Sequence, residues 1–319
     1  MFRPVDNSSF PGRRPGVAWN PRCVTISHPH PVGVTLDPRI AVLVRPDGRV
    51  QFGWDPERAL VLSPPPGIRT EQLLAVVRLL DGKNTRPHIL WTAVGYGLAP
   101  TDVSKLLGDL DRAGLIDVAG TSPIADTITI RVHGRGPLSD AVSAGLTDGG
   151  IRVSRSFRYS ADGDVRRWNA LCVVLADDLV ADPRLAADLV QNGIPHLQVR
   201  LRDGRGVVGP LVLPGHTSCL RCADLLRAAY DEDWPHLSAQ LLGTVGHASP
   251  AVIMATTAVA LGQLEAVLSA PRGAPPSSLD ATLEIDLGAH RLVTRRWPRQ
   301  ASCSCTYLAP AVGESNRHR

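Results

Sequence analysis

The stretch TITIRVHGRGPLSDAVSAGLTDGGIRVSRS, residues 127–156, decides the fold of the larger part of this chain. It places a β-branched strand, a glycine turn, an alanine-rich helix and a second strand in succession, which predicts a βαβ unit. Two more apolar strands, ALCVVLADD (170–178) and IPHLQVRL (194–201), flank the helical segment 182–193. This alternation predicts an α/β fold with a Rossmann-like sheet over 124–310, ending in a hairpin over 282–297.

Residues 31–120, which precede this unit, have a different pattern of apolar residues. Residues 39–55 form two short apolar runs around an Asp-Gly turn, which predicts a β-hairpin. Three short helices follow between residues 70 and 114, with Thr70 and Thr101 as expected N-caps. A hairpin followed by three helices predicts a winged-helix-like domain over 31–120. Residues 1–30 and 311–319 are expected to be a flexible arm and a disordered tail.

The glycine turn HGRGPLS fits the pattern G-x-G-x-x-S at Gly134, Gly136 and Ser139. Glycines at this place can let a phosphate approach a helix N-terminus. Here Ser139 replaces the third glycine, Pro137 removes one N–H group, and no acidic residue follows the second strand. We therefore favour a structural turn, and nucleotide binding remains the alternative.

Six cysteines are present, and four of them form two close pairs: Cys219 with Cys222, and Cys303 with Cys305. Four thiolates in two pairs suit a tetrahedral, structural Zn²⁺ site with no open position for catalysis. A redox pair, a disulfide and unrelated thiols are the alternatives, and the nearby His216 could compete as a ligand. Cys172 lies in an apolar strand and is expected in the core, whereas Cys23 has no evident partner.

Composition and charge exclude several classes of function. The formal net charge is +4 and no dense Lys/Arg run is present, so nucleic acid is not an expected partner. The apolar segment 249–270 contains Gln263 and Glu265, which favours a buried helix over a membrane span. No secretory signal pattern is evident at the N-terminus. These features predict a cytoplasmic protein in which thiols stay reduced.

The second domain resembles the ThiF-like (ubiquitin-activating-enzyme-like) superfamily, in its cyclodehydratase or leader-peptide-binding branch. The resemblance rests on RWPRQASCSC (296–305) and on a Gly-Ile-Pro strand leading to G-x-V-x-P-G-x-x-x-C-x-x-C, which matches at Gly193, Ile194, Pro195, Gly209, Pro214, Gly215, Cys219 and Cys222. It implies a leader-recognition role for the first domain, a ribosomal precursor peptide and a YcaO-type protein as partners, and a possible homodimer.

The chain departs from the adenylating members of that superfamily. After the second strand it reads SRSFRYSADGDVRRWNAL, without the Asn-x-x-Arg-Gln run, and no lysine follows that strand. Asp177 or Asp178 stands where the superfamily places a Mg²⁺-binding aspartate, although a lone carboxylate there is also expected to cap the following helix. No transferring cysteine follows Cys222, and ATP with Mg²⁺ is therefore not an expected cofactor.

Three functions are left open. The first is a non-adenylating scaffold, without catalytic residues of its own, that presents a precursor peptide to a YcaO-type cyclodehydratase. The second is an ATP-dependent adenylyltransferase of the ThiF/MoeB type, and the third is a winged-helix transcription regulator. For the first, we expect the peptide to add a strand at an exposed edge formed by Val50, Gln51 and Phe52, beside Lys105 on the third helix. Coverage of that edge by residues 1–30 is the alternative.

Overall fold

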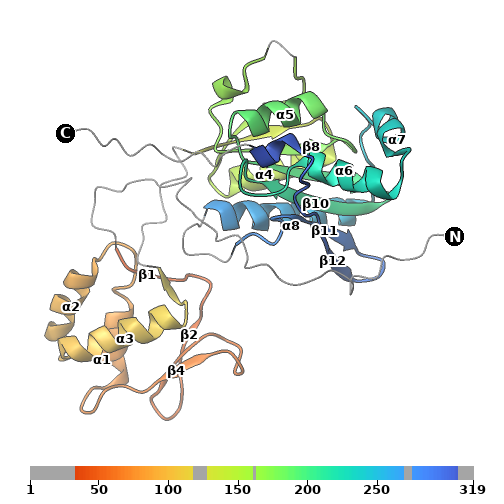
Figure 1. Ribbon diagram of the computed structural model, residues 1–319. Helices are drawn as coiled ribbons and strands as arrows, with labels where there is room; N and C mark the ends of the chain where they lie inside the picture. The colour runs from red at the N-terminus through yellow and green to blue at the C-terminus, as the bar shows by residue number, and fades with distance from the viewer. Residues whose placement is uncertain (1–32, 118–127, 161–162, 269–274, 308–319) are drawn as a thin grey trace, which may run out of the picture. The chain divides into compact units, whose positions relative to one another are not determined.

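The computed structural model describes residues 33–117, 128–160, 163–268 and 275–307, which belong to two compact units (Figure 1). The N-terminal unit comprises residues 33–117 and the C-terminal unit comprises residues 128–307. The predicted arm, the tail and Cys23 lie outside the described residues.

The N-terminal unit combines a small antiparallel sheet with three helices. Its elements are β1 (Thr35–Leu36), β2 (Val42–Val44), β3 (Val50–Phe52), β4 (Leu60–Leu62), α1 (Thr70–Val77), α2 (Arg86–Gly95), α3 (Pro100–Arg112) and β5 (Ile116–Asp117). The sheet order is β2-β3-β4, and β1 pairs with β5. The hairpin and the three helices were predicted from the sequence, but β1, β4 and β5 were not. The N-caps of α1 and α3 are Arg69 and Ala99 rather than Thr70 and Thr101.

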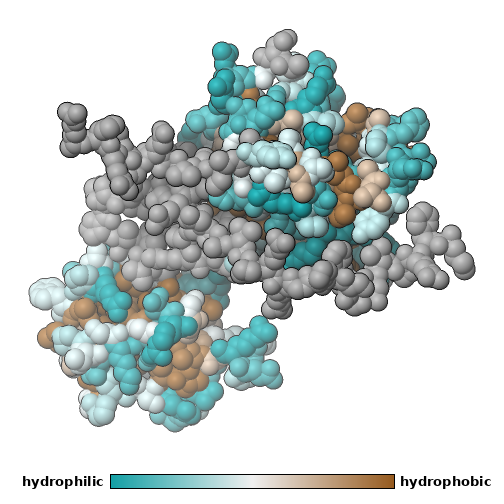
Figure 2. Space-filling view, in the orientation of Figure 1, coloured by the Kyte–Doolittle hydropathy of each residue, from teal (hydrophilic) through white to brown (hydrophobic). Residues whose placement is uncertain are grey.

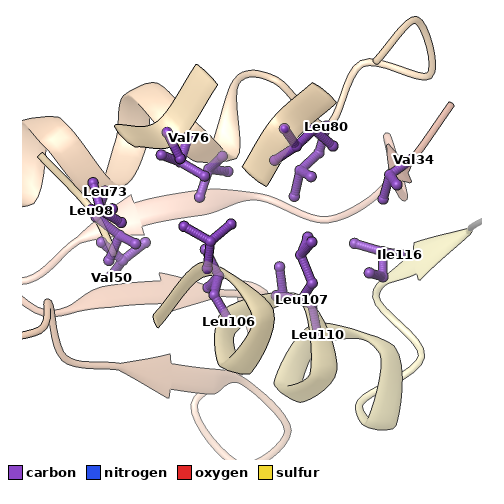
Figure 3. Close-up of a cluster of buried hydrophobic side chains, with 14 of the residues drawn as sticks. Val34, Val50, Leu73, Val76, Leu80, Leu98, Leu106, Leu107, Leu110 and Ile116 are labelled. Carbon is purple, nitrogen blue, oxygen red and sulfur yellow. The ribbon is translucent and has the colours of Figure 1, made fainter. Parts of the chain in front are cut away.

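An apolar core holds the N-terminal unit together (Figure 3). In α3 the buried residues recur at intervals of three and four, which places them on one face of the helix. They are Val103, Leu106, Leu107 and Leu110. Residues of α1 and β3 complete the core, among them Leu73, Val76, Val50 and Phe52. Leu107 is fully buried within this core.

The C-terminal unit is built on one seven-stranded mixed sheet. Its strands are β6 (Thr129–His133), β7 (Arg152–Ser156), β8 (Cys172–Asp177), β9 (His196–Arg202), β10 (Arg205–Val212), β11 (Ala281–Asp286) and β12 (Arg291–Arg296). Its helices are α4 (Pro137–Asp148), η2 (Val165–Trp168), α5 (Pro183–Gln191), α6 (Leu220–Tyr230), α7 (Trp234–Gln240), α8 (Pro250–Leu268) and η3 (Ser304–Tyr307). This confirms a mixed α/β fold.

The sheet order, β12-β11-β10-β9-β8-β6-β7, explains where a ligand site should lie. Strands β7, β6, β8 and β9 run parallel, whereas β10, β11 and β12 extend the sheet antiparallel. The chain leaves β6 for β7 on one side and returns to β8 on the other side. The order therefore reverses between β6 and β8, and ligands of open α/β sheets bind beyond the carboxyl ends of the strands at such a switch point.

Helix α8 is the apolar segment that the sequence singled out. It packs against α4 and against β10. A side chain at Gly145 of α4 would meet Leu261 at 2.5 Å, so glycine allows the two helices to approach closely. Within the described residues, α8 is the one helix long and apolar enough to cross a membrane. Its buried face, which includes Thr256, Ala260 and Leu264, is that of a helix packed on a protein core.

Candidate functional site

Two segments far apart in the sequence bring four cysteines together. Cys219 is the N-cap residue of α6 and Cys222 lies in its first turn, so both thiols point to the same side of the helix. Cys305 lies in η3 and Cys303 immediately precedes it. The four Sγ atoms lie within 4.8 Å of one another, and all four residues are buried. The four cysteines can therefore hold a metal ion.

The spacing of the sulfur atoms fits a tetrahedral thiolate site. The Sγ atom of Cys219 lies 3.9 Å from that of Cys222 and 3.6 Å from that of Cys303, and the Cys222–Cys305 distance is 3.4 Å. Zinc–sulfur bonds of about 2.3 Å at the tetrahedral angle put the sulfur atoms about 3.8 Å apart. A disulfide would need about 2.05 Å, so the four residues are free thiols.

Neighbouring hydrogen-bond donors stabilise the thiolate form of Cys222, which is the form that binds a metal cation. The hydrogen bond from the Cys219 thiol lowers the pKa of the Cys222 thiol, while the same contact raises the pKa of Cys219. The N–H group of Gln300 also points at Cys222 Sγ, at 3.5 Å. Such donors stabilise the negative charge of a thiolate. His216, the predicted competing ligand, is not a member of this group.

Besides the cysteine cluster, hydrogen bonds of Arg299 and Gln300 join the segment 298–307 to the rest of the unit. Arg299 donates from its guanidinium group to the carbonyl oxygens of Gly215, at 3.1 Å, and Cys305, at 3.0 Å. The preceding residue, Trp297, is buried and donates through Nε1 to Thr282 Oγ1. Cys172 is a core residue of β8 outside this cluster, and burial raises the pKa of its thiol to about 12.

The glycine turn leads from β6 into α4, and the chain itself fills the place where a phosphate could bind. The carboxylate of Asp177 accepts hydrogen bonds from the N–H groups of Leu138, at 2.9 Å, and Ser139, at 3.2 Å. Pro137 has no N–H group to offer. An anion at a helix N-terminus satisfies free N–H groups and the helix dipole. Here that anion is Asp177, which is 1% exposed.

Gly134 and Gly136 allow the close contact between Asp177 and the N-terminus of α4. A Cβ atom at Gly136 would lie 2.7 Å from Asp177 Oδ1, and one at Gly134 would lie 2.4 Å from the carbonyl oxygen of Ala176. Both are closer than Cβ atoms approach other groups, so the glycines allow the end of β8 to lie against the turn. Ser139 accepts from Gly136 N–H through its hydroxyl. The capped helix is α4, which precedes Asp177, whereas the following helix α5 is capped by Asp182.

The prediction of an exposed edge at residues 50–52 is wrong, because these residues form the central strand of the sheet. Strand β3, with Val50, Gln51 and Phe52, pairs with β2 on one side and β4 on the other, and all three residues are buried. The sequence signal for a hairpin did not include the third strand, Leu60–Leu62. Among the described residues, the outer strands of this sheet are β2 and β4. Lys105 is exposed on α3, as expected.

The hydrogen-bond pattern shows which backbone groups face outward. Gly53 N–H donates to Ala41 and Arg45 N–H to Arg49, so odd-numbered residues of β3 bond to β2. Backbone hydrogen bonds alternate in direction along an antiparallel strand, so the backbone groups of Val50 and Phe52 bond to β4. The backbone N–H and C=O groups of Val61, the central residue of β4, therefore point away from the sheet. On the opposite edge, the backbone groups of Val42 and Val44 point away from the sheet by the same rule.

Exposed apolar side chains are also present on the N-terminal unit. Figure 2 shows apolar surface among hydrophilic side chains on its visible face. In β2, Leu43 and Val44 are 42% and 54% exposed, whereas the three residues of β4 are half-buried. The side chains of β2 are therefore more exposed than those of β4.

Comparison with known proteins identifies the fold. A scan against models of known protein families gives no match, and a search of curated protein sequences gives none. Among solved structures, the heterocyclase TruD matches with a TM-score of 0.60 and 17% identity over 86% of this chain. A heterocyclase in complex with substrate and cofactor matches with a TM-score of 0.61 and 15% identity over 87% of this chain.

Escherichia coli MccB, in complex with MccA-N7isoASN, matches with a TM-score of 0.55 and 15% identity over 86% of this chain and 99% of its own. The chain spans less than half of the two heterocyclases, 43% and 40% of their lengths. At these identities the likeness concerns the fold. The chain thus has the fold shared by TruD-type heterocyclases and MccB.

Proposed function

We propose that this protein is a non-adenylating, ThiF-like scaffold of a peptide-modifying pathway. It binds the leader segment of a ribosomal precursor peptide and presents it to a YcaO-type cyclodehydratase. The observation that carries the proposal is that β4 is an outer strand of the sheet formed by the described residues, with the Val61 N–H and C=O groups facing outward. Such an edge is a template for one more strand.

The leader-binding role belongs to the N-terminal unit, which we assign as the winged-helix-like recognition domain. Strand β4 carries no charge, and Leu60 and Leu62 pack against the core. A peptide strand beside β4 gains main-chain hydrogen bonds at Val61 and can bury apolar side chains against the neighbouring surface. Affinity is modest, because a disordered segment must be ordered on binding.

The C-terminal unit supplies a zinc-stabilised platform in this proposal. Zn²⁺ bound by Cys219, Cys222, Cys303 and Cys305 would cross-link η3 to α6. With four thiolate ligands the ion has no open coordination position, so it supplies stability and no chemistry on the substrate. The same unit is proposed to carry the surface for the YcaO-type partner and any homodimer contact.

The turn before α4 supports the part of the proposal that the protein does not adenylate a substrate. The carboxylate of Asp177 already accepts hydrogen bonds from the N–H groups that a phosphate would need. A bound nucleotide would have to displace a buried negative charge. This supports a scaffold over an adenylyltransferase.

A pair of proline variants tests the peptide role. Val61→Pro removes an outward N–H group and leaves the β3–β4 hydrogen bonds intact. The control Val44→Pro removes an outward N–H group on the β2 edge and leaves the β2–β3 hydrogen bonds intact. The probe is a fluorescein-labelled leader of a precursor peptide encoded beside this gene, titrated by fluorescence polarisation. Val61→Pro should weaken binding at least roughly tenfold, a loss of about 1.4 kcal/mol, and Val44→Pro should not. Equal binding by both variants and the wild type would reject the proposal.

The adenylyltransferase remains the second candidate, because solved structures with this fold include MccB with ATP, at a TM-score of 0.53. The scaffold predicts no exchange of labelled pyrophosphate into ATP, with or without the leader peptide. Exchange that depends on both ATP and peptide would favour the second candidate. Because the test uses no peptide edge variant, its outcome is independent of the polarisation result.

A further inference from the structure

The seven-stranded sheet of the C-terminal unit has an outer strand, β12, whose residues are all exposed (Figure 1). Within the described ranges, β12 pairs with β11 alone. Two of its residues are apolar, Leu292 and Val293, and they are 57% and 46% exposed. Because successive side chains of a strand point to opposite faces, each face of this edge carries one exposed apolar side chain.

Three residues of β12 direct their backbone groups away from the sheet. Trp297 N–H donates to the carbonyl oxygen of Asp280, at 2.7 Å, so these two residues form a hydrogen-bonded pair at the base of the β11–β12 ladder. Such pairs recur at every second residue of an antiparallel ladder, so residues 291, 293 and 295 bond to β11. The N–H and C=O groups of Leu292, Thr294 and Arg296 therefore point outward. This row is longer than that of β4, where Val61 is the outward residue.

The two ends of β12 carry positive charges. Arg291 and Arg296 are exposed, and neither has an ion-pair partner among the residues with described placement. Charged side chains on an outer strand are a common protection against uncontrolled strand pairing. Such charges also select by sign, because a segment that carries carboxylates at matching positions is attracted where a basic one is repelled.

The carboxylates of the neighbouring strand do not neutralise this edge. Glu284 of β11 is shared by Arg295, at 3.3 Å, and Arg202, at 3.0 Å. Asp286, which faces Arg291 across the ladder, pairs with Arg205 at 2.9 Å. The positive charge around β12 therefore exceeds the negative charge, and an acidic partner is the complementary one.

Neither a second copy of β12 nor another part of this chain offers that complement. A second copy would bring the same arginines against the edge, and like charges on facing strands are destabilising. Outside the described residues, the segments 1–32, 269–274 and 308–319 each contain more arginines than carboxylates. The segment 118–127 contains a single carboxylate, which cannot match both ends of the strand, and the segment 161–162 is too short to form a strand.

We propose that β12 binds an extended acidic segment of another protein by strand addition. The segment bonds through its main chain to the outward groups of Leu292, Thr294 and Arg296, with carboxylates near Arg291 and Arg296 and apolar residues beside Leu292 and Val293. Main-chain bonds supply affinity and the charges select the partner. Nucleic acid is less suitable, because phosphates use neither the row of C=O groups nor the apolar side chains. The surface belongs to neither β4 nor the cysteines, so its failure would leave the proposed function standing.

The test is a fluorescence-polarisation titration of the full chain with a labelled peptide. The probe contains Glu-Thr-Val-Val-Thr-Glu between glycines, a palindrome that presents the same pattern in either strand direction. It should bind saturably, and more weakly as the salt concentration rises. Two altered probes should each bind at least roughly tenfold more weakly: one with lysines in place of the glutamates, and one with N-methylated backbone groups, which cannot form the strand pairing. A single-stranded oligonucleotide should not compete.

Variants of the edge complete the test. Thr294→Pro removes the central outward N–H group and keeps the β11–β12 hydrogen bonds, so it should weaken binding at least roughly tenfold. The double variant with Arg291→Glu and Arg296→Glu should lose the glutamate probe and gain the lysine probe, a rescue that also shows that the edge is folded. Arg152→Glu, on the other outer strand β7, is the matched control and should leave the affinity unchanged.

Four outcomes would overturn the proposal. The glutamate probe may show no saturable binding, or the lysine or N-methylated probe may bind as tightly as it does. The oligonucleotide may displace it, which would indicate a general anion surface. Thr294→Pro may bind like the wild type, or Arg152→Glu may lose as much affinity as the charge reversal on β12.

Discussion

Cys305→Ser should cost the C-terminal unit its metal and much of its stability. The serine leaves three thiolates in a site built for four, and the segment 298–307 then depends on Arg299 and on the buried Trp297. Of the two Arg299 hydrogen bonds, the one to Gly215 joins the segment to the rest of the unit and contributes about 1 kcal/mol, which is little for a segment of this length. We therefore expect a metal bound by the four cysteines to be the principal stabiliser of this segment.

The size of the loss follows from mass action. If free zinc exceeds its dissociation constant a thousandfold, binding adds about 4 kcal/mol to the free energy of unfolding. For a unit of this length, 1 kcal/mol shifts the melting temperature by about 2–4 °C, so loss of zinc should lower it by about 8–16 °C. Chelation of the wild type under reducing conditions should produce a similar drop.

The assay combines elemental analysis with calorimetric melting, and Cys172→Ala is the matched control. Cys172 is as buried as the four cysteines of the cluster but lies outside it, so its substitution should retain one zinc per chain and cost only about 1 kcal/mol. A metal-free wild type that melts at the same temperature as the zinc-loaded protein would refute this reasoning. Stoichiometric zinc in Cys305→Ser would do so as well.

Two further predictions concern buried groups of the C-terminal unit. Burial lowers the pKa of His196 to about 4, so its contribution to stability is present above pH 6.5 and is lost as the pH falls toward 4. Between pH 7 and pH 4.5, the free energy of unfolding of His196→Leu should therefore fall by about 2–3 kcal/mol less than that of the wild type, as measured by urea denaturation. An equal fall in both proteins would contradict this. Asp177→Asn should lower the free energy of unfolding by about 1–2 kcal/mol, because the N-terminus of α4 loses its anion, whereas Asp148→Asn should change it by less than about 0.5 kcal/mol.

Local signals in the sequence were sufficient for the core of the fold. The strand–turn–helix–strand pattern of residues 127–156 specified β6, α4 and β7, because each element carries its own period and its own turn residues. The paired spacing of Cys219 with Cys222 and of Cys303 with Cys305 specified a four-sulfur cluster, because each pair forms one half of a chelate.

Long-range contacts could not be predicted in the same way. Strand β4 is three residues long and ends at a proline-rich segment, so nothing local distinguishes it from a loop, and its omission misplaced the peptide edge onto Gln51. The bond from Leu138 to Asp177 joins residues 39 positions apart. Each of these depends on tertiary packing rather than on a pattern of neighbours.

Hydrogen exchange at Val61 tests the central claim most directly. In the free protein its N–H group faces outward from the edge of the sheet and should exchange quickly. When the leader peptide is added in excess, the account predicts that exchange at Val61 slows at least roughly tenfold while Val42 and Val44 on the opposite edge remain unchanged. Saturating peptide that leaves exchange at Val61 unchanged, or that protects Val42 and Val44 instead, would contradict it.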